Sequence, residues 1–79
     1  MTTLAISVVI PCYNEERNIR RCLETVLKQS ILDYEVIVVD DGSTDKTKAI
    51  VREYKVRLLE QNHLGPGAAR NLGGKEAKG

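Results

Sequence analysis

Three short segments of the sequence place an aromatic ring, carboxylates and a basic side chain after apolar runs. Tyr13 can stack its ring on a nucleobase while its hydroxyl stays in water. An ionised Asp41 only accepts hydrogen bonds, so it can pair with the N–H groups of a base. The small residues of segment 65–69 allow close backbone approach to a ligand, and Arg70 can bind a phosphate or pair with an acid. Together these groups predict a nucleotide pocket.

Each of these residues also has a purely structural interpretation. Tyr13 alone is as typical of a packing residue as of a stacking platform, and Asp-Asp-Gly-Ser after a strand is more often a turn and helix cap. Glu15 is equally consistent with a charge in the first turn of a helix. His63, in a polar loop, is predicted to be solvent-exposed and without a function. Only the conjunction of groups favours a site.

The strands that position these groups are predicted from three β-branched apolar runs. They span residues 4–10, 34–39 and 56–59, and the first is expected to end at Pro11. Runs that are apolar on both faces are typical of a parallel sheet. The Asp40-Asp41 pair directly follows the second run, so its carboxylates are expected at the carboxyl edge of the sheet.

Helices are predicted after each strand from apolar residues spaced at i, i+3 and i+4. Asn14 is predicted to cap the first, about four turns long, with Cys22 on its buried face. Ser43 or Thr44 is predicted to cap the second, and Pro66 begins the third. The β-α-β-α-β-α order predicts an α/β fold with a Rossmann-like parallel sheet and helices on its faces. Loops 11–15, 40–44 and 61–66 then meet where ligands bind such sheets.

Composition and charge exclude several other classes of protein. The 79 residues are 42% hydrophobic and 29% charged, which predicts one small globular domain. A formal net charge of +1 gives no strong field toward nucleic acid. The chain has neither an apolar run of the about 20 residues that span a bilayer nor a signal peptide, so we expect a cytoplasmic protein without a membrane segment. Cys12 and Cys22 are predicted to be inert thiols.

Two other α/β enzyme classes fit the motifs poorly. A dinucleotide-dependent dehydrogenase would need G-x-G-x-x-G after the first strand, where this chain has Pro-Cys-Tyr-Asn-Glu-Glu. A phosphoacceptor receiver domain would need its acidic pair after the first strand, whereas Asp40 and Asp41 follow the second. We therefore set both classes aside.

Three motifs resemble those of family 2 glycosyltransferases with the GT-A fold, in the order and spacing of that family. They are Val-Val-Ile-Pro-Cys-Tyr-Asn-Glu-Glu at 8–16, Val-Val-Asp-Asp-Gly-Ser-Thr-Asp at 38–45, and Asn-His-Leu-Gly-Pro-Gly-Ala-Ala-Arg-Asn-Leu-Gly at 62–73. The resemblance covers nearly the whole chain. It implies a strand order of 3-2-1 and transfer of a sugar from a nucleotide-sugar, usually a UDP-sugar, to an acceptor.

The resemblance also implies roles for single residues. The nucleotide-binding residues would be Pro11, Tyr13, Glu15, Asp40, Asp41 and Arg70. Tyr13 would lie near the base, Asp41 would hydrogen-bond it, and Asp40 would support the loop. Arg70 would lie near the base and the diphosphate. No catalytic residue and no metal ligand of the family is expected within these 79 residues.

The chain departs from the family pattern after the third helix. The family continues with a fourth strand ending in Asp-x-Asp, which holds Mg²⁺ or Mn²⁺ on the diphosphate, and with a general base further on. Residues 1–79 contain neither. The resemblance thus implies an amino-terminal nucleotide-binding portion, inactive alone, of a metal-dependent and in some cases membrane-associated enzyme. Gly73 and Gly74, at about 1 kcal/mol each relative to Ala, predict a weak third helix.

A second hypothesis belongs to a different functional class. With strand order 3-2-1, the first strand is apolar on both faces and lies at an open edge of the sheet. Long apolar edges recruit further strands. This predicts a non-catalytic module that self-associates as a homodimer, through its first strand or through an exchanged element.

Overall fold

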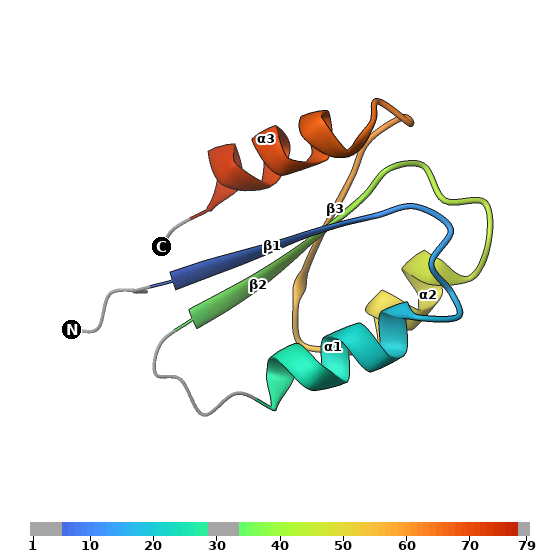
Figure 1. The fold of residues 1–79 in the computed structure, drawn as a ribbon, viewed down its shortest axis with the longest axis vertical. Coiled ribbons are helices and arrows are strands. Elements are labelled where there is room, and N and C mark those ends of the chain that lie inside the picture. The colour runs from blue at the N-terminus through green and yellow to red at the C-terminus, as the bar shows by residue number, and fades with distance from the viewer. Residues whose placement is uncertain (1–5, 29–33, 78–79) are drawn as a thin grey trace.

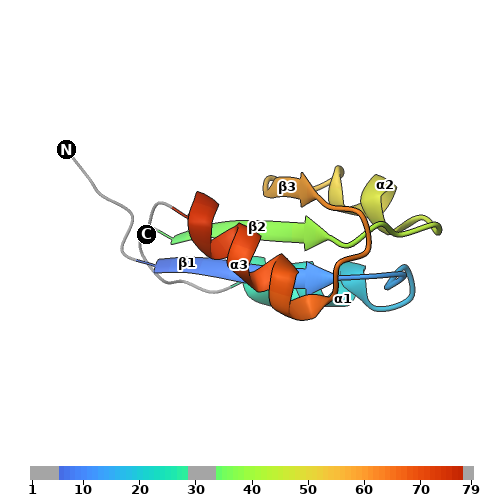
Figure 2. The same cartoon turned by 90° about the horizontal axis from the view of Figure 1, so that it is seen from above.

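The structure is a computed structural model that describes residues 6–28 and 34–77 of the chain. Its elements are β1 (Ile6–Cys12), α1 (Ile19–Leu27), β2 (Tyr34–Asp40), α2 (Thr47–Val51), β3 (Arg57–Glu60) and α3 (Pro66–Glu76). The three strands are parallel in the order β1-β2-β3, which confirms the predicted sheet and strand order. Helices α1 and α2 lie on one face of the sheet and α3 lies on the other (Figures 1 and 2).

The central strand β2 supplies both layers of the hydrophobic core. Alternate side chains of a strand point to opposite faces. On one face Val36 and Val38 pack with Ile19 and Leu23 of α1 and with Val51 of α2. The opposite cluster combines Ile37 and Val39 with Ala69 of α3. The continuous apolar sequence of β2 is thus explained by helices that cover both of its faces.

Helix α3 packs closely on the sheet because Gly73 has no side chain. A Cβ at Gly73 would clash with Cγ1 of Val9 and lie 3.3 Å from Cγ2 of Val39. At the far end of the helix, Arg57 Nη1 donates a 2.8 Å hydrogen bond to the carbonyl oxygen of Glu76. The prediction of a weak third helix considered only helix propensity and not this packing. In the structure α3 extends over 11 residues. Gly73 lowers the helix propensity, but its missing side chain allows the close contact with the sheet.

Several boundaries differ from the sequence predictions. Strand β1 passes through Pro11, which pairs with Val39, and ends at Cys12; proline is tolerated there because β1 is an edge strand of this sheet. Helix α1 starts only at Ile19 and has nine residues, fewer than the four turns expected. Cys12 is the buried thiol, whereas Cys22 is only half-buried. Residues 4–5 of the predicted first strand lie outside the described residues.

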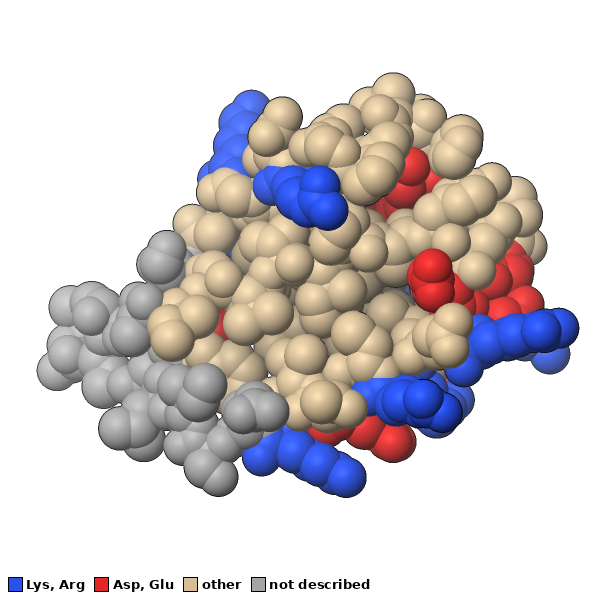
Figure 3. Space-filling view, in the orientation of Figure 1, with Lys and Arg blue, Asp and Glu red and all other residues tan. Residues whose placement is uncertain are grey.

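Figure 3 shows the distribution of charged side chains on one face of the molecule. Lys and Arg side chains lie mostly around the rim of this face, and its middle, over β1, carries few charges. Within residues 6–28 and 34–77, no helix has the length and apolar composition required to cross a membrane.

Candidate functional site

A cavity of about 290 Å³ opens at the carboxyl ends of the strands. It is lined by Pro11, Cys12, Tyr13, Glu15, Asp41, Pro66, Ala69 and Arg70. Five of the six residues expected to bind a nucleotide therefore border one space. The exception is Asp40, which is fully buried and does not line the cavity.

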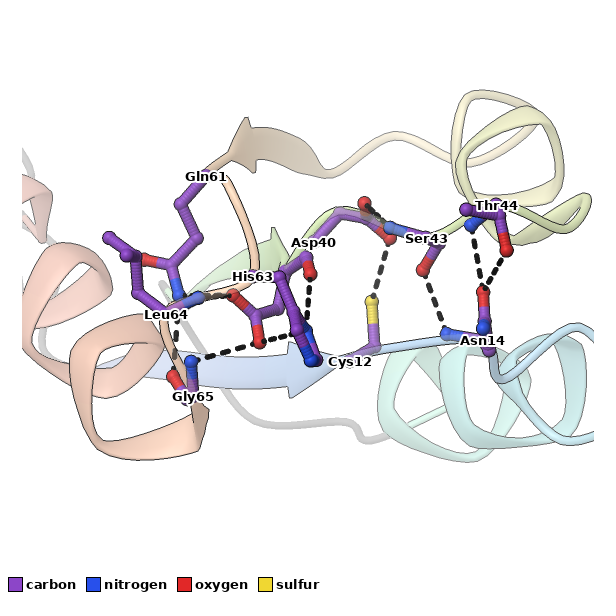
Figure 4. Close-up of polar contacts among 10 residues, drawn as sticks. Cys12, Asn14, Asp40, Ser43, Thr44, Gln61, His63, Leu64 and Gly65 are labelled. Carbon is purple, nitrogen blue, oxygen red and sulfur yellow. Dashed lines mark hydrogen bonds and ion pairs between the residues drawn. The ribbon is translucent and has the colours of Figure 1, made fainter.

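The loops after β1 and β2 are joined by reciprocal hydrogen bonds through Asn14 (Figure 4). Oδ1 of Asn14 accepts from the backbone N–H of Thr44 at 2.8 Å and from that of Asp45 at 3.3 Å. In return, the Asn14 N–H donates to Oγ of Ser43 at 2.8 Å. Asn14 has a φ of 49°, in the left-handed region that asparagine tolerates better than most residues. This clamp fixes the backbone next to Tyr13.

The predicted N-terminal caps of α1 and α2 were therefore wrong. Asn14 does not cap α1, whose N-cap position is occupied by Asn18 without a side-chain hydrogen bond. Neither Ser43 nor Thr44 caps α2; the N–H of Thr47 is instead accepted by Asp45 Oδ1 at 2.9 Å. Side chains typical of caps serve here to hold one loop against the other, a role that only the folded sheet brings about.

Asp41 organises the third loop, which connects β3 to α3. Its Oδ1 accepts from Gln61 Nε2 at 2.7 Å and from the N–H of Leu64 at 2.6 Å. Its Oδ2 accepts from the N–H of Gly65 at 3.0 Å. Burial raises the pKa of the Asp41 carboxyl, but the Gln61, Leu64 and Gly65 hydrogen bonds and the nearby His63 together outweigh it and hold that pKa below its usual range. Asp41 is thus a carboxylate that fixes the N-terminal end of α3.

Asp40 supports the loop after β2 from within the core. Its Oδ2 accepts the N–H of Ser43 at 2.9 Å, and its Oδ1 lies 3.7 Å from Cys12 Sγ. Burial and the adjacent Asp40 carboxylate raise the pKa of the Cys12 thiol to about 12. Cys12 therefore stays a neutral thiol in the cavity wall at physiological pH.

His63 is the residue of this region to which the sequence analysis assigned no function. Its imidazole lies against the Tyr13 ring, with centroids 4.3 Å apart and planes inclined by 32°. Nδ1 of His63 is also 3.3 Å from Oδ2 of Asp41. A single histidine in a polar loop carries no periodicity or motif, so only the meeting of loops 11–15 and 61–66 could have revealed this contact.

Arg70 brings a positive charge to the cavity from the first turns of α3. Its side chain is exposed, and within the described part of the chain it makes no hydrogen bond or ion pair. Arginine in this state is suited to phosphate oxygens. Among residues 6–28 and 34–77, no group of three or more His, Cys, Asp or Glu side chains could hold a metal ion.

An open sheet of three parallel strands, with helices on both faces, matches the GT-A fold of solved glycosyltransferase structures. The chain belongs to glycosyl transferase family 2, whose sequence pattern it matches over residues 7–79.

Curated relatives and solved structures agree with this assignment. The chain is 43% identical over 82 residues to the glycosyltransferase AglE of Haloferax volcanii, covering 94% of this chain and 27% of AglE. The crystal structure of S. aureus TarS 1–349 superposes with a TM-score of 0.86 at 39% identity, over 94% of this chain and 24% of that one. The structure of the mannosyltransferase PcManGT from Pyrobaculum calidifontis, in complex with GDP-Man and Mn²⁺, superposes with a TM-score of 0.87 at 29% identity. This match covers 98% of this chain and 25% of PcManGT. The chain spans less than a third of these relatives.

Proposed function

We propose that residues 1–79 supply the nucleotide-binding part of an enzyme that transfers a sugar from a nucleotide-sugar, specifically a UDP-sugar, to an acceptor. The observation that carries this proposal is the convergence of Tyr13, Asp41 and Arg70 on one cavity. An aromatic face, a hydrogen-bond acceptor and a cation are the three groups that a base and a diphosphate require.

The three groups divide the work of binding. Tyr13 and Pro11 offer apolar surface to the base, while Arg70 offers its guanidinium to the diphosphate. A base N–H would reach Asp41 by replacing the Gln61 amide, which also contacts the carbonyl oxygen of Gly65 at 3.3 Å and can keep that partner. Asp40 acts indirectly, because it holds the loop that carries Asp41.

The metal and the general base of the reaction are assigned to residues outside this chain. The family resemblance implies Mg²⁺ or Mn²⁺ on the diphosphate, and PcManGT was solved with Mn²⁺. The described residues offer no cluster of ligands for such an ion. We accordingly expect residues 1–79 to bind the nucleotide weakly, with little help from metal, and not to turn over.

The proposal is tested by measuring hydrolysis or transfer of nucleotide-sugars by the full-length protein that contains these residues. We expect release of UDP from one member of a panel of UDP-sugars, dependent on Mn²⁺ or Mg²⁺, and none from residues 1–79 alone. Arg70→Ala should reduce turnover by tenfold or more, since loss of a charged hydrogen bond to the donor costs about 1.5–3 kcal/mol. Turnover of GDP-sugars alone would refute the uridine assignment, and turnover by residues 1–79 would refute the division of roles.

A further inference from the structure

His63 is exposed and yet fixed in place by contacts with two residues of the cavity wall. Its side chain is 66% accessible, so burial does not hold it. Its backbone has a φ of 39°, a left-handed conformation that non-glycine residues rarely adopt. Nδ1 lies 3.3 Å from both Oδ2 and the backbone oxygen of Asp41 (Figure 4). The imidazole ring also packs against the tilted ring of Tyr13.

The imidazole reaches these residues from outside the cavity. Tyr13 and Asp41 line the cavity, whereas His63 does not. His63 therefore contacts two residues that line the cavity without lining it itself. Gly42 makes room for this arrangement, because a Cβ there would lie 3.1 Å from the backbone nitrogen of His63.

We propose that His63 is a positioning residue that fixes the Tyr13 ring and the Asp41 carboxylate in the orientation in which they bind the nucleobase. The inference rests on the nucleotide-binding role proposed above and adds a residue that acts on the base only through others. Stacking restricts rotation of the Tyr13 ring, which is otherwise 40% exposed. A ring held in place before binding loses less rotamer freedom when a base stacks on it.

Two substitutions separate the ring of His63 from its hydrogen-bonding nitrogen. His63→Asn keeps a polar N–H donor and a residue type that tolerates the left-handed backbone, but it has no ring. His63→Phe keeps a ring without the donor. Leu64→Ala is the matched control, because the Leu64 side chain is 67% exposed and its contact with Asp41 comes from the backbone N–H. Thermal melts of all three variants establish that they are folded.

The readouts are the aromatic NMR signals of Tyr13 in the free protein and the affinity for UDP. We expect His63→Asn to move the Tyr13 ring signals and to weaken UDP binding about threefold to tenfold, the size of one aromatic contact. His63→Phe should restore part of both, and Leu64→Ala should match the wild type.

Two results for His63→Asn would overturn the inference. One is unchanged Tyr13 signals, and the other is UDP binding as tight as that of the wild type or tighter. Tighter binding would mean that His63 competes with the base for Tyr13. Failure of the wild type itself to bind UDP would instead contradict the proposed function. In that case the Tyr13 signals of the free protein still decide whether His63 fixes the ring.

Discussion

At the scale of single residues, the site consists of a few carboxylates and amides whose hydrogen bonds are made before any ligand arrives. Asp41 accepts from three groups of the β3–α3 loop, and Asp40 accepts from Ser43 in the loop after β2. These bonds hold in place the two loops that border the cavity. Preorganisation of this kind lowers the entropy lost on binding.

The two cysteines should differ strongly in reactivity. Only the thiolate reacts with alkylating agents, and Cys12, 6% exposed with a pKa raised to about 12, is almost wholly protonated at neutral pH. We expect iodoacetamide to modify the half-buried Cys22 at least tenfold faster than Cys12. Mass spectrometry of tryptic peptides resolves the two sites, because Arg17, Arg20 and Arg21 lie between them.

A Cys22→Ser variant serves as the control for this measurement. It leaves Cys12 as the single thiol, which should stay largely unmodified until the chain is unfolded. Rapid modification of Cys12 in the folded variant would show that its thiol is neither buried nor neutral.

At the scale of elements, much of the arrangement was predictable and its closest contacts were not. The β-branched runs predicted all three strands and a parallel sheet, and the family resemblance implied the strand order that the structure has. The role of Asn14 was not predictable, since its partners Ser43 and Thr44 are about 30 residues away and meet it only in the folded sheet. Gly73 was likewise judged by its helix propensity, which says nothing of the valine beneath it.

Adjacent glycines of α3 should respond in opposite directions to the same substitution. A Cβ at Gly73 would clash with the branched side chain of Val9, whereas a Cβ at Gly74 meets nothing within 4 Å. Gly73→Ala should lower the free energy of unfolding by about 1–3 kcal/mol through overpacking. Gly74→Ala should raise it by about 0.5–1 kcal/mol, because alanine favours the helix.

Urea denaturation followed by circular dichroism measures both effects, and the Gly74 variant is the matched control for the change in helix propensity. Equal stabilisation by the two substitutions would mean that α3 does not pack against β1 at Gly73.

At the scale of the whole molecule, β1 is an edge strand of the sheet that the described residues form. It pairs with β2 on one side only, and the surface over it in Figure 3 carries few charges. Edge strands of this kind usually carry charges or other features that block further pairing. The open edge supports the hypothesis that two copies of the chain associate through β1.

Light scattering coupled to size exclusion tests this hypothesis directly. We expect residues 1–79 to elute as a dimer at high concentration. Ile6→Lys, at an exposed position of the edge strand, should shift the chain toward the monomer, whereas Glu24→Lys, at an exposed position of α1, should not. A monomer of 8.8 kDa at every concentration would exclude self-association.

The proposed function depends above all on nucleotide binding in the cavity between β1, the loop after β2 and α3. Titration of ¹⁵N-labelled residues 1–79 with UDP, followed by amide chemical shifts, tests it most directly because it detects millimolar binding and maps it. We predict saturable shifts at residues 11–15, Asp41 and 65–70. Mg²⁺, which is diamagnetic and replaces Mn²⁺ in this experiment, should change these shifts little. The Arg70→Ala variant should lose most of them. Shifts confined to other parts of the sheet, or no shifts at millimolar UDP, would contradict the claim.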